Sequence, residues 1–417
     1  MGQIMKILVS SGLGRLHLDK VASLLKINTN FEVTFITGAI PNKFMASIFF
    51  GIFGKLIYGR KNIHKSINLR IPKGFEREEV ISLYIPDIVL FFGLILNKLH
   101  LVSINKVYST AYFIFGFLSS FRIKDFDAIY IRAGAGSKFI NKAKRLGKHV
   151  IVDHSSEHPN DIYNSLLQSK SKNALVGFQK RKNLWKMVVN DINDSDIVVV
   201  NAQQVVDSLI NNGIPKNKIF LNHLPVDVKK IPCKVSYKIN NQINIGYSGM
   251  FIPRKGCDTL LKVIENLSYT YKNIKLNIYG IVEPHYYRNQ LFIKLKQSKH
   301  LVEHGHLDQA NLFECLKEMD VYTFLSHSEG SAQSVKEAMA IGLPVICTES
   351  TGAPIQNNVN GIICKADLNS CCDSLIFLLE NEKQRLRLGS SARLEISDNH
   401  NNLKFTSILQ KLINKQY

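Results

Sequence analysis

The sequence lacks the features that mark secreted, zinc-binding or membrane-spanning proteins. Its seven Cys residues include no C-x2-C pair, and several fall within predicted helices or strands, which predicts reduced thiols in a cytosolic protein rather than disulfides or a zinc site. No uncharged apolar run reaches the about 20 residues that a membrane-spanning helix needs. The longest runs are residues 88–96 and 107–121. The chain enters a predicted strand at residues 7–10, so no secretory signal is expected.

Acidic residues are scarce, mainly in the first half of the chain. The sequence carries 53 Lys and Arg against 33 Asp and Glu, and residues 1–230 carry 32 against 16. Such a basic face attracts nucleic acid, anionic lipid or a phosphorylated substrate. Apolar clusters at residues 44–57, 90–96 and 113–118 accompany this charge, and Lys43, Lys55, Arg60 and Lys61 flank the first. This favours an anionic membrane surface over nucleic acid; core helices with solvated ends remain the alternative.

The 417 residues suggest two domains, and one stretch organises the second. Residues 321–325 read as a buried strand, residues 326–331 as a polar turn, and the apolar spacing from Ala332 as a helix. Gly342 ends that helix, and residues 343–347 form the next strand. Glu329 therefore lies where a strand's carboxyl end meets a helix, which is where ligands bind to an open parallel sheet.

The residue types in this turn suit a phosphorylated, hydroxyl-rich ligand. Gly330 lets a ligand approach the backbone, and free N–H groups of Ser331, Ala332 and Gln333 are expected to point from the helix start toward an anion. Glu337, about two turns along, is placed to accept hydrogen bonds from a diol such as ribose. The alternative is an ordinary capped helix with a solvated Glu.

The segment from Glu329-Gly330 through Glu337 to Gly342-Leu343-Pro344 resembles the E-x7-E signature of retaining GT-B glycosyltransferases of family 4. The resemblance is specific over residues 240–395 and weaker before them. It implies an α/β fold of two Rossmann-like, doubly wound domains that face each other across a cleft. The expected divisions are an acceptor-side domain at 1–225, a linker at 226–240, a nucleotide-sugar domain at 241–398, and a helix at 399–417 that crosses back.

The resemblance also implies donor-binding residues elsewhere in the second domain. Lys255 stands in the family's diphosphate-binding loop after Gly249, whereas Met250 occupies a position where the family often has Arg. Arg254 is a candidate to supply that charge. Loops at Gly280 and His306 are implied to border the nucleotide base.

The first domain offers weaker signals. Gly12 and Gly14 follow the first strand, which suggests a glycine loop facing the donor phosphates, as in the family. His154 ends another strand and resembles the family's cleft His; a structural His is the alternative. Residues 40–120 read as irregular and residues 160–190 as one long polar helix.

Two Asp-x-Asp strings, residues 125–127 and 194–196, precede predicted strands. Because ligands bind at the other end of such strands, neither is expected to hold a metal, and no cofactor is predicted.

The expected activity is transfer of a hexose, with retention, from a UDP- or GDP-sugar to a saccharide acceptor. Glu329 and His154 are the expected catalytic residues. The basic, apolar first half suggests a lipid-linked acceptor in bacterial surface polysaccharide synthesis, such as capsule, O-antigen or lipopolysaccharide, at the inner face of the cytoplasmic membrane. A GT-B nucleotide-sugar epimerase or hydrolase is the main alternative. Nucleic-acid binding is suggested by net charge alone, and the chain lacks a recognition motif for it.

Overall fold

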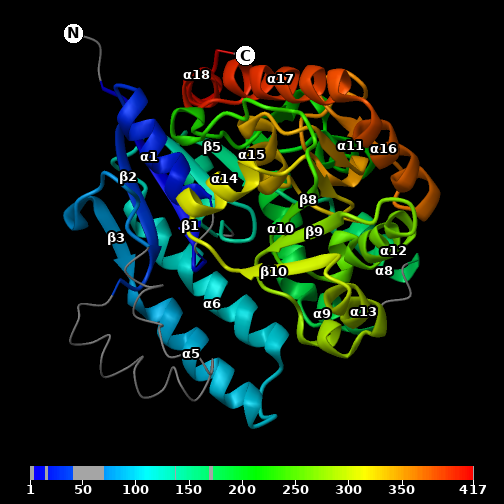
Figure 1. Cartoon of the computed structure of the whole chain (residues 1–417). Helices are drawn as coiled ribbons and strands as arrows, with labels where there is room; N and C mark the ends of the chain where they lie inside the picture. The colour runs from blue at the N-terminus through cyan, green and yellow to red at the C-terminus, as the bar shows by residue number, and fades with distance from the viewer. Residues whose placement is uncertain (1–3, 15–16, 41–69, 137, 169–171, 417) are drawn as a thin grey trace. The chain divides into compact units, whose positions relative to one another are not determined.

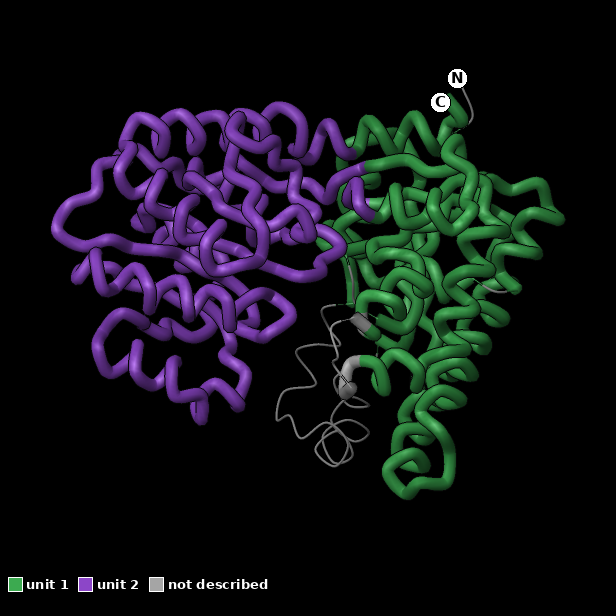
Figure 2. The backbone as a smooth tube through the Cα atoms, turned by 90° about the vertical axis from the view of Figure 1, so that its right-hand side faces the viewer, with its two compact units in different colours: residues 1–200, 205–221, 406–417 green, residues 201–204, 222–405 purple. Residues whose placement is uncertain are grey.

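The computed structural model describes residues 4–14, 17–40, 70–136, 138–168 and 172–416 (Figure 1). The first apolar cluster, residues 44–57, and its basic flanks lie outside these ranges. The chain divides into two compact units, coloured separately in Figure 2. Unit 1 holds residues 1–200, 205–221 and 406–417, and unit 2 holds residues 201–204 and 222–405.

Unit 1 is built on a seven-stranded sheet in which every strand pair is parallel, in the order β3-β2-β1-β4-β5-β6-β7. The strands are β1 (Lys6–Gly12), β2 (Glu32–Gly38), β3 (Val80–Leu83), β4 (Ala128–Arg132), β5 (His149–His154), β6 (Ile197–Val200) and β7 (Ile219–Leu221). The central strands are buried on both faces, which explains why they read as continuous apolar runs. The strand order reverses between β1 and β4, so the carboxyl ends of these two strands border the position where such sheets bind ligands.

The helices around this sheet differ from the sequence prediction in two places. They are α1 (Leu18–Asn28), α5 (Tyr84–Lys98), α6 (Ile104–Ser119), α7 (Lys138–Arg145), α8 (Pro159–Gln168), α9 (Lys172–Gln179), α10 (Lys182–Asp194) and α11 (Gln203–Asn211), with 3-10 turns η2 (Arg77–Glu79), η3 (Ser120–Arg122) and η4 (Lys216–Lys218). The single helix predicted over residues 160–190 is wrong, because α8, α9 and α10 share that region. The irregular structure predicted for residues 40–120 is also wrong where the chain is described. That part contains β3, α5 and α6. Their sequence is apolar over long stretches, so the alternation of apolar and polar residues that predicts a helix is weak.

Unit 2 repeats the plan with a six-stranded sheet, again with parallel pairs, in the order β10-β9-β8-β11-β12-β13. The strands are β8 (Ile243–Ser248), β9 (Ile274–Tyr279), β10 (Leu301–Gly305), β11 (Val321–Phe324), β12 (Val345–Cys347) and β13 (Ile362–Ile363). The helices are α12 (Cys257–Ser268), α13 (Gln290–Gln297), α14 (Gln309–Lys317), α15 (Gln333–Ile341), α16 (Leu368–Glu380) and α17 (Glu382–Asn399), with 3-10 turns η5 (Val228–Lys230), η6 (Pro253–Lys255), η7 (Pro284–Arg288) and η8 (Glu349–Thr351). The last helix, α18 (Asn402–Ile413), begins in unit 2 and belongs to unit 1 from residue 406. The predicted strand, turn, helix and strand over residues 321–347 are confirmed as β11, α15 and β12.

The segment predicted as a linker, residues 226–240, packs onto unit 2. Val226, Ile231 and Tyr237 are buried in its hydrophobic core. The Tyr237 hydroxyl donates a hydrogen bond to the carbonyl oxygen of Gly342 at 2.7 Å. This anchoring holds the segment against the carboxyl end of α15.

Within the described residues, no helix is both long enough and apolar enough to cross a membrane.

Candidate functional site

The candidate site of unit 2 is formed by loops at the carboxyl ends of three neighbouring strands, β8, β11 and β12. The β8 loop runs through η6 into α12, and the β11 loop, residues 325–332, runs into α15. Gly256 makes the first connection possible, because its φ is +71° and a Cβ there would lie 1.8 Å from the Leu325 carbonyl oxygen. The two loops are therefore packed directly against each other.

Glu329 meets both cations of the β8 loop. Its Oε1 lies 3.1 Å from Arg254 Nη1 and 3.6 Å from Lys255 Nζ. This oxygen is buried, yet neither contact has hydrogen-bond geometry. The guanidinium of Arg254 instead donates to the carbonyl oxygen of Ser328. The three predicted side chains are thus brought together as one ion-pair cluster, with a carboxylate oxygen still able to accept a hydrogen bond.

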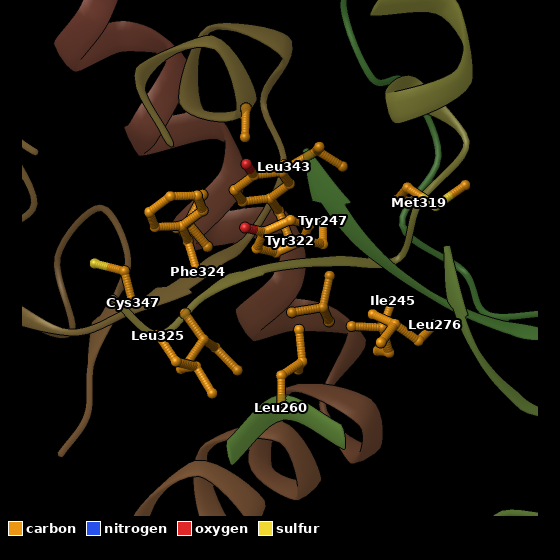
Figure 3. Close-up of a cluster of buried hydrophobic side chains, with 14 of the residues drawn as sticks. Ile245, Tyr247, Leu260, Leu276, Met319, Tyr322, Phe324, Leu325, Leu343 and Cys347 are labelled. Carbon is orange, nitrogen blue, oxygen red and sulfur yellow. The ribbon is translucent and has the colours of Figure 1, made fainter. Parts of the chain in front are cut away.

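Buried aromatic rings lie beneath Lys255. Its ammonium is 5.2 Å from the centroid of the Phe324 ring, which stacks on Tyr247 at 5.5 Å. Figure 3 shows Tyr247, Tyr322 and Phe324 gathered in this cluster. On the loop side, Gly249 has a φ of +128°, and a Cβ there would lie 3.2 Å from Lys255 Nζ. The ammonium therefore lies between an aromatic ring and a backbone position where a side chain would crowd it.

The turn leading into α15 contains further buried oxygens without hydrogen-bond partners among the described residues. They are Ser331 Oγ and Gln333 Oε1. Buried polar atoms are rarely left unpaired in folded proteins, so their concentration beside Glu329 indicates a ligand site. The prediction that the Ala332 N–H is free is wrong, because it donates to the Thr351 carbonyl oxygen at 2.8 Å. The loop after β12 uses that donor to close the turn.

Glu337 and its neighbour Lys336 are held on different sides of α15. Glu337 is half-buried and accepts a hydrogen bond from Gln309 Nε2 at 3.3 Å. Lys336 is fully buried and donates to the Leu224 carbonyl oxygen at 2.8 Å. A buried ammonium without such a partner would be costly, so this bond fixes the rotation of α15.

Gly280 and His306 are the two residues predicted to border the nucleotide base. The backbone at Gly280 requires a glycine, whereas His306 lies on the surface. Gly280 has a φ of +143°, and a Cβ there would lie 2.1 Å from the Gly249 carbonyl oxygen. His306 is exposed just beyond β10. His304, which was not predicted, stacks on Tyr279 at 4.4 Å and contacts Asn277 Oδ1 through Nε2 at 3.0 Å. Burial lowers the pKa of His304.

One supporting residue was missed by sequence reasoning. The side-chain amide of Gln204, in the short 201–204 segment of unit 2, donates to the carbonyl oxygen of Glu329 and, at 3.3 Å, to that of Ser350. The Glu329 N–H donates to the same Ser350 oxygen at 2.9 Å. These bonds position the backbone of Glu329. An isolated Gln gives no sequence signal for such a role.

In unit 1, His154 ends β5 as predicted, and its ring is buried. Its Nε2 has no hydrogen-bond partner among the described residues. Burial, only partly opposed by the charge of Asp153, lowers the pKa of His154 to about 4. At neutral pH the ring is therefore uncharged, with one polar nitrogen unpaired.

The neighbouring Asp153 binds a different imidazole. Asp153 Oδ1 lies 2.7 Å from His17 Nε2, and Asp153 Oδ2 accepts a hydrogen bond from the Tyr130 hydroxyl at 2.7 Å. Although burial of Asp153 acts to raise its pKa, His17 and Tyr130 more than offset it and the net pKa is lowered. His17 follows the predicted glycine loop, so the sequence located this loop but not the His–Asp pair, which is 136 residues apart.

Gly12 and Gly14, the glycines of this loop, lie against different neighbours. Gly12 has a φ of +68°, and a Cβ there would lie 3.0 Å from Ala135 Cβ. A Cβ on Gly14 would lie 3.4 Å from Arg132 Nη1. The backbone of the loop therefore comes close to a guanidinium at the end of β4.

Each Asp-x-Asp string precedes one strand and accepts a backbone hydrogen bond from the neighbouring strand, β1 for the first string and β5 for the second. Asp127 Oδ2 accepts from the Lys6 N–H at 2.8 Å, and Asp196 Oδ2 accepts from the Val150 N–H at 2.9 Å. Both strings lie at the amino ends of strands, as predicted. In the described part of the chain, no group of three or more His, Cys, Asp or Glu side chains is placed to hold a metal ion.

Comparison with known proteins shows what the second half of the chain resembles. Residues 234–395 match the family model of the glycosyl transferases group 1. Over 196 residues, covering 45% of this chain and 49% of the relative, the sequence is 29% identical to the capsular polysaccharide biosynthesis glycosyltransferase CapM of Staphylococcus aureus. Over 195 residues, covering 42% and 51%, it is 25% identical to a GDP-mannose-dependent monoacylated alpha-(1-6)-phosphatidylinositol monomannoside mannosyltransferase of Corynebacterium glutamicum. These matches span about half the length of each relative.

Among solved structures, Anabaena HepE in complex with UDP superposes with a TM-score of 0.62 over 99% of this chain and 100% of that one, at 15% identity. A likeness at that identity shows the fold. The predicted GT-B architecture of two doubly wound α/β units is thereby confirmed.

Proposed function

Because residues 234–395 of this chain match the family model of the glycosyl transferases group 1, we propose that the protein transfers a sugar from a nucleotide-sugar donor to a saccharide acceptor. The observation that carries the proposal is the cluster of Glu329 with Arg254 and Lys255 at the carboxyl ends of β8 and β11. The unpaired oxygens of Ser331 and Gln333 beside it support the same site.

The cations of this cluster suit a diphosphate leaving group. In the structure, the anion that they face is the Glu329 carboxylate. The diphosphate of a donor carries the same sign of charge and takes its place against Lys255 and Arg254, which stabilise the charge that develops when the bond to the sugar breaks. Glu329 is then free to hold the sugar or to stabilise positive charge at its anomeric carbon. Glu337 binds the ribose hydroxyls.

The resemblance to the E-x7-E glycosyltransferases is the basis for proposing the sugar, the stereochemistry and the donor. The transferred group is a hexose, its anomeric configuration is retained, and the donor is a UDP- or GDP-sugar. The UDP in HepE and the GDP-mannose in the name of the Corynebacterium relative support one nucleotide each. His154 positions donor or acceptor from unit 1. The reaction needs no metal, because two side-chain cations serve the leaving group.

The acceptor is proposed to be lipid-linked, in the synthesis of a bacterial surface polysaccharide. The capsular role in the name of CapM and the phosphatidylinositol acceptor in the name of the Corynebacterium enzyme support this class. The net charge of +20 supports a protein that works against an anionic surface, which we place at the inner face of the cytoplasmic membrane.

Thermal-shift screening against UDP, GDP, ADP and their sugars tests the donor site directly. A ligand that binds only the folded state raises the melting temperature, by an amount that grows with its concentration. We expect a response to one nucleoside diphosphate and none to the matching nucleoside. No response to any diphosphate would contradict the proposal.

The reaction is then followed with the donor sugar that binds, with and without added membrane lipids as acceptor source and with and without EDTA. Product that requires acceptor and survives EDTA supports a metal-independent transferase. Turnover of the donor without acceptor would instead identify an epimerase or hydrolase.

A further inference from the structure

The helical pair α5 and α6 of unit 1, which lie side by side in Figure 1, leaves a continuous apolar stripe exposed. The stripe, here called the α5 stripe, consists of Ile85, Ile88, Phe92, Leu96 and Leu99, whose exposed fractions range from 38% to 61%. Their spacing of three or four residues places them on one face of the helix, along about 21 Å. Isolated exposed apolar residues are ordinary, but a contiguous row marks an interaction surface.

The helices that carry the α5 stripe are poor in acidic residues. In residues 84–124 the only carboxylate belongs to Asp87, and it is paired with Arg70 at 2.6 Å and largely buried. Lys98 and Lys106 are exposed on either side of the turn that joins the two helices. This turn also exposes Leu101. An apolar row with a basic end and no exposed carboxylate is complementary to an anionic lipid surface.

Two phenylalanines, Phe113 of α6 and Phe121 of the following turn η3, provide a contrast. Phe113 and Phe121 are also exposed, but Lys138 Nζ lies 5.7 Å from the first ring and Lys142 Nζ lies 4.7 Å from the second. Ammonium groups from α7 therefore already occupy these ring faces. No described cation is recorded over a ring of the α5 stripe.

We propose that the α5 stripe inserts into the interfacial region of an anionic bilayer, with Lys98 and Lys106 at the lipid head groups. Among the described helices none can span a membrane, so α5 lies in the plane of the surface. The proposal deepens the membrane association proposed above by naming the element that carries it. It does not depend on the transfer reaction.

Vesicle sedimentation tests this assignment with the full-length protein. We expect binding to phosphatidylcholine vesicles containing one quarter phosphatidylglycerol, and weaker binding to pure phosphatidylcholine. The variant I88Q/F92Q/L96Q should bind the anionic vesicles ~100-fold less well, since each buried apolar side chain contributes a large share of interfacial affinity. K98Q/K106Q should lose about 25-fold and become less sensitive to salt.

A matched control removes exposed apolar side chains from unit 2. F377Q/L386Q/L394Q alters three residues that are exposed to a similar degree on α16 and α17, and it should bind vesicles like the wild type. All variants should keep the wild-type thermal shift with the nucleoside diphosphate, which separates loss of lipid binding from failure of the donor site.

Three results would overturn the proposal. The first is a wild-type protein that does not bind anionic vesicles. The second is unchanged binding by I88Q/F92Q/L96Q, which would place the lipid contact elsewhere, with residues 41–69 among the candidates. The third is a wild-type dimer, detected by light scattering, that dissociates in this variant while vesicle binding is unaffected, because a second copy would then be what covers the stripe.

Discussion

Lys255 and Glu329 come from different loops of the same sheet edge, and their charged groups approach to 3.6 Å. Lys255 follows β8 and Glu329 follows the neighbouring strand β11. Because the second cation, Arg254, approaches the same carboxylate oxygen, Glu329 both compensates the cations and competes with any anion for them.

The first prediction concerns Glu329→Ala. Turnover should fall by about 10²–10³-fold or more, because a charged group beside the reacting carbon is lost. Affinity for the nucleoside diphosphate should be unchanged or higher, because the competing carboxylate is gone. Initial rates and calorimetric titration measure the two effects separately. Glu382→Gln, at an exposed acid on α17, is the control. Full activity of Glu329→Ala would refute the assigned role.

The second prediction separates the two cations. Lys255→Gln should weaken diphosphate binding by about 10–100-fold, the usual range for a charged hydrogen bond, and leave binding of the nucleoside unchanged. Arg254→Gln should have a smaller effect, because its side chain is 51% exposed whereas that of Lys255 is 17% exposed. Calorimetry with both ligands measures this. An equal loss for nucleoside and diphosphate would argue against phosphate contact.

The third prediction tests the ribose contact of Glu337. Glu337→Ala should bind the ribonucleoside diphosphate about tenfold less well, because one charge-assisted contact to the sugar hydroxyls is lost. The 2′,3′-dideoxy analogue should bind the variant and the wild type equally. If the substitution weakened both ligands to the same extent, Glu337 would act through the fold of α15 instead.

The fourth prediction compares two glycines with positive φ. Gly280→Ala should lower the free energy of unfolding by about 3 kcal/mol or more, since a strained backbone is combined with a Cβ only 2.1 Å from the Gly249 oxygen. Gly147 also has a positive φ, +68°, but a Cβ there would meet open space. Gly147→Ala should therefore lower the free energy of unfolding by only about 1 kcal/mol. Urea unfolding measures both. Equal losses would show that the close approach of β8 and β9 is easily relieved.

The fifth prediction concerns pH. The pKa of His154 is about 4 in the folded protein, whereas an unperturbed histidine has a pKa of 6.5. Protonation of His154 therefore favours the unfolded chain. The stability that this group contributes is fully present above pH 6.5 and is lost progressively as pH falls toward 4, by roughly 3 kcal/mol in total.

This pH effect is measured by urea unfolding of the wild type and His154→Asn at pH 7.5 and pH 4.5. The difference between the two pH values should be smaller in the variant. It should not vanish, because burial also lowers the pKa of His223, to about 3. Parallel behaviour of both proteins would mean that His154 is not desolvated.

The sequence predicted the second unit better than the first, for physical reasons. Around Glu329 the strand, turn and helix follow one another directly, so local periodicity and the glycine and proline positions were sufficient. In α5, apolar residues occur on most faces, so helical periodicity is weak. The folded chain buries only Pro86 and Phe91 from this helix, a distinction that depends on tertiary packing.

Contacts between residues far apart in the chain could not be predicted from local sequence patterns. The pair of His17 and Asp153 forms only because β1 and β5 end at the same edge of a parallel sheet. The bond from Gln204 to the Glu329 carbonyl oxygen likewise joins residues that are 125 positions apart in the sequence. The prediction of a free Ala332 N–H failed because the loop after β12 supplies an acceptor, which no local pattern shows.

The division of the chain into units limits which truncated fragments can be expected to fold. The chain passes from one unit to the other after residues 200, 204, 221 and 405, so neither unit is a continuous segment. Residues 406–417 belong to the first unit, where His149 Nε2 of β5 contacts the carbonyl oxygen of Leu412 in α18 at 3.1 Å. An expression fragment ending near residue 400 would therefore damage the amino-terminal unit, and isolated donor-site fragments should be made by loop replacement rather than by a single cut.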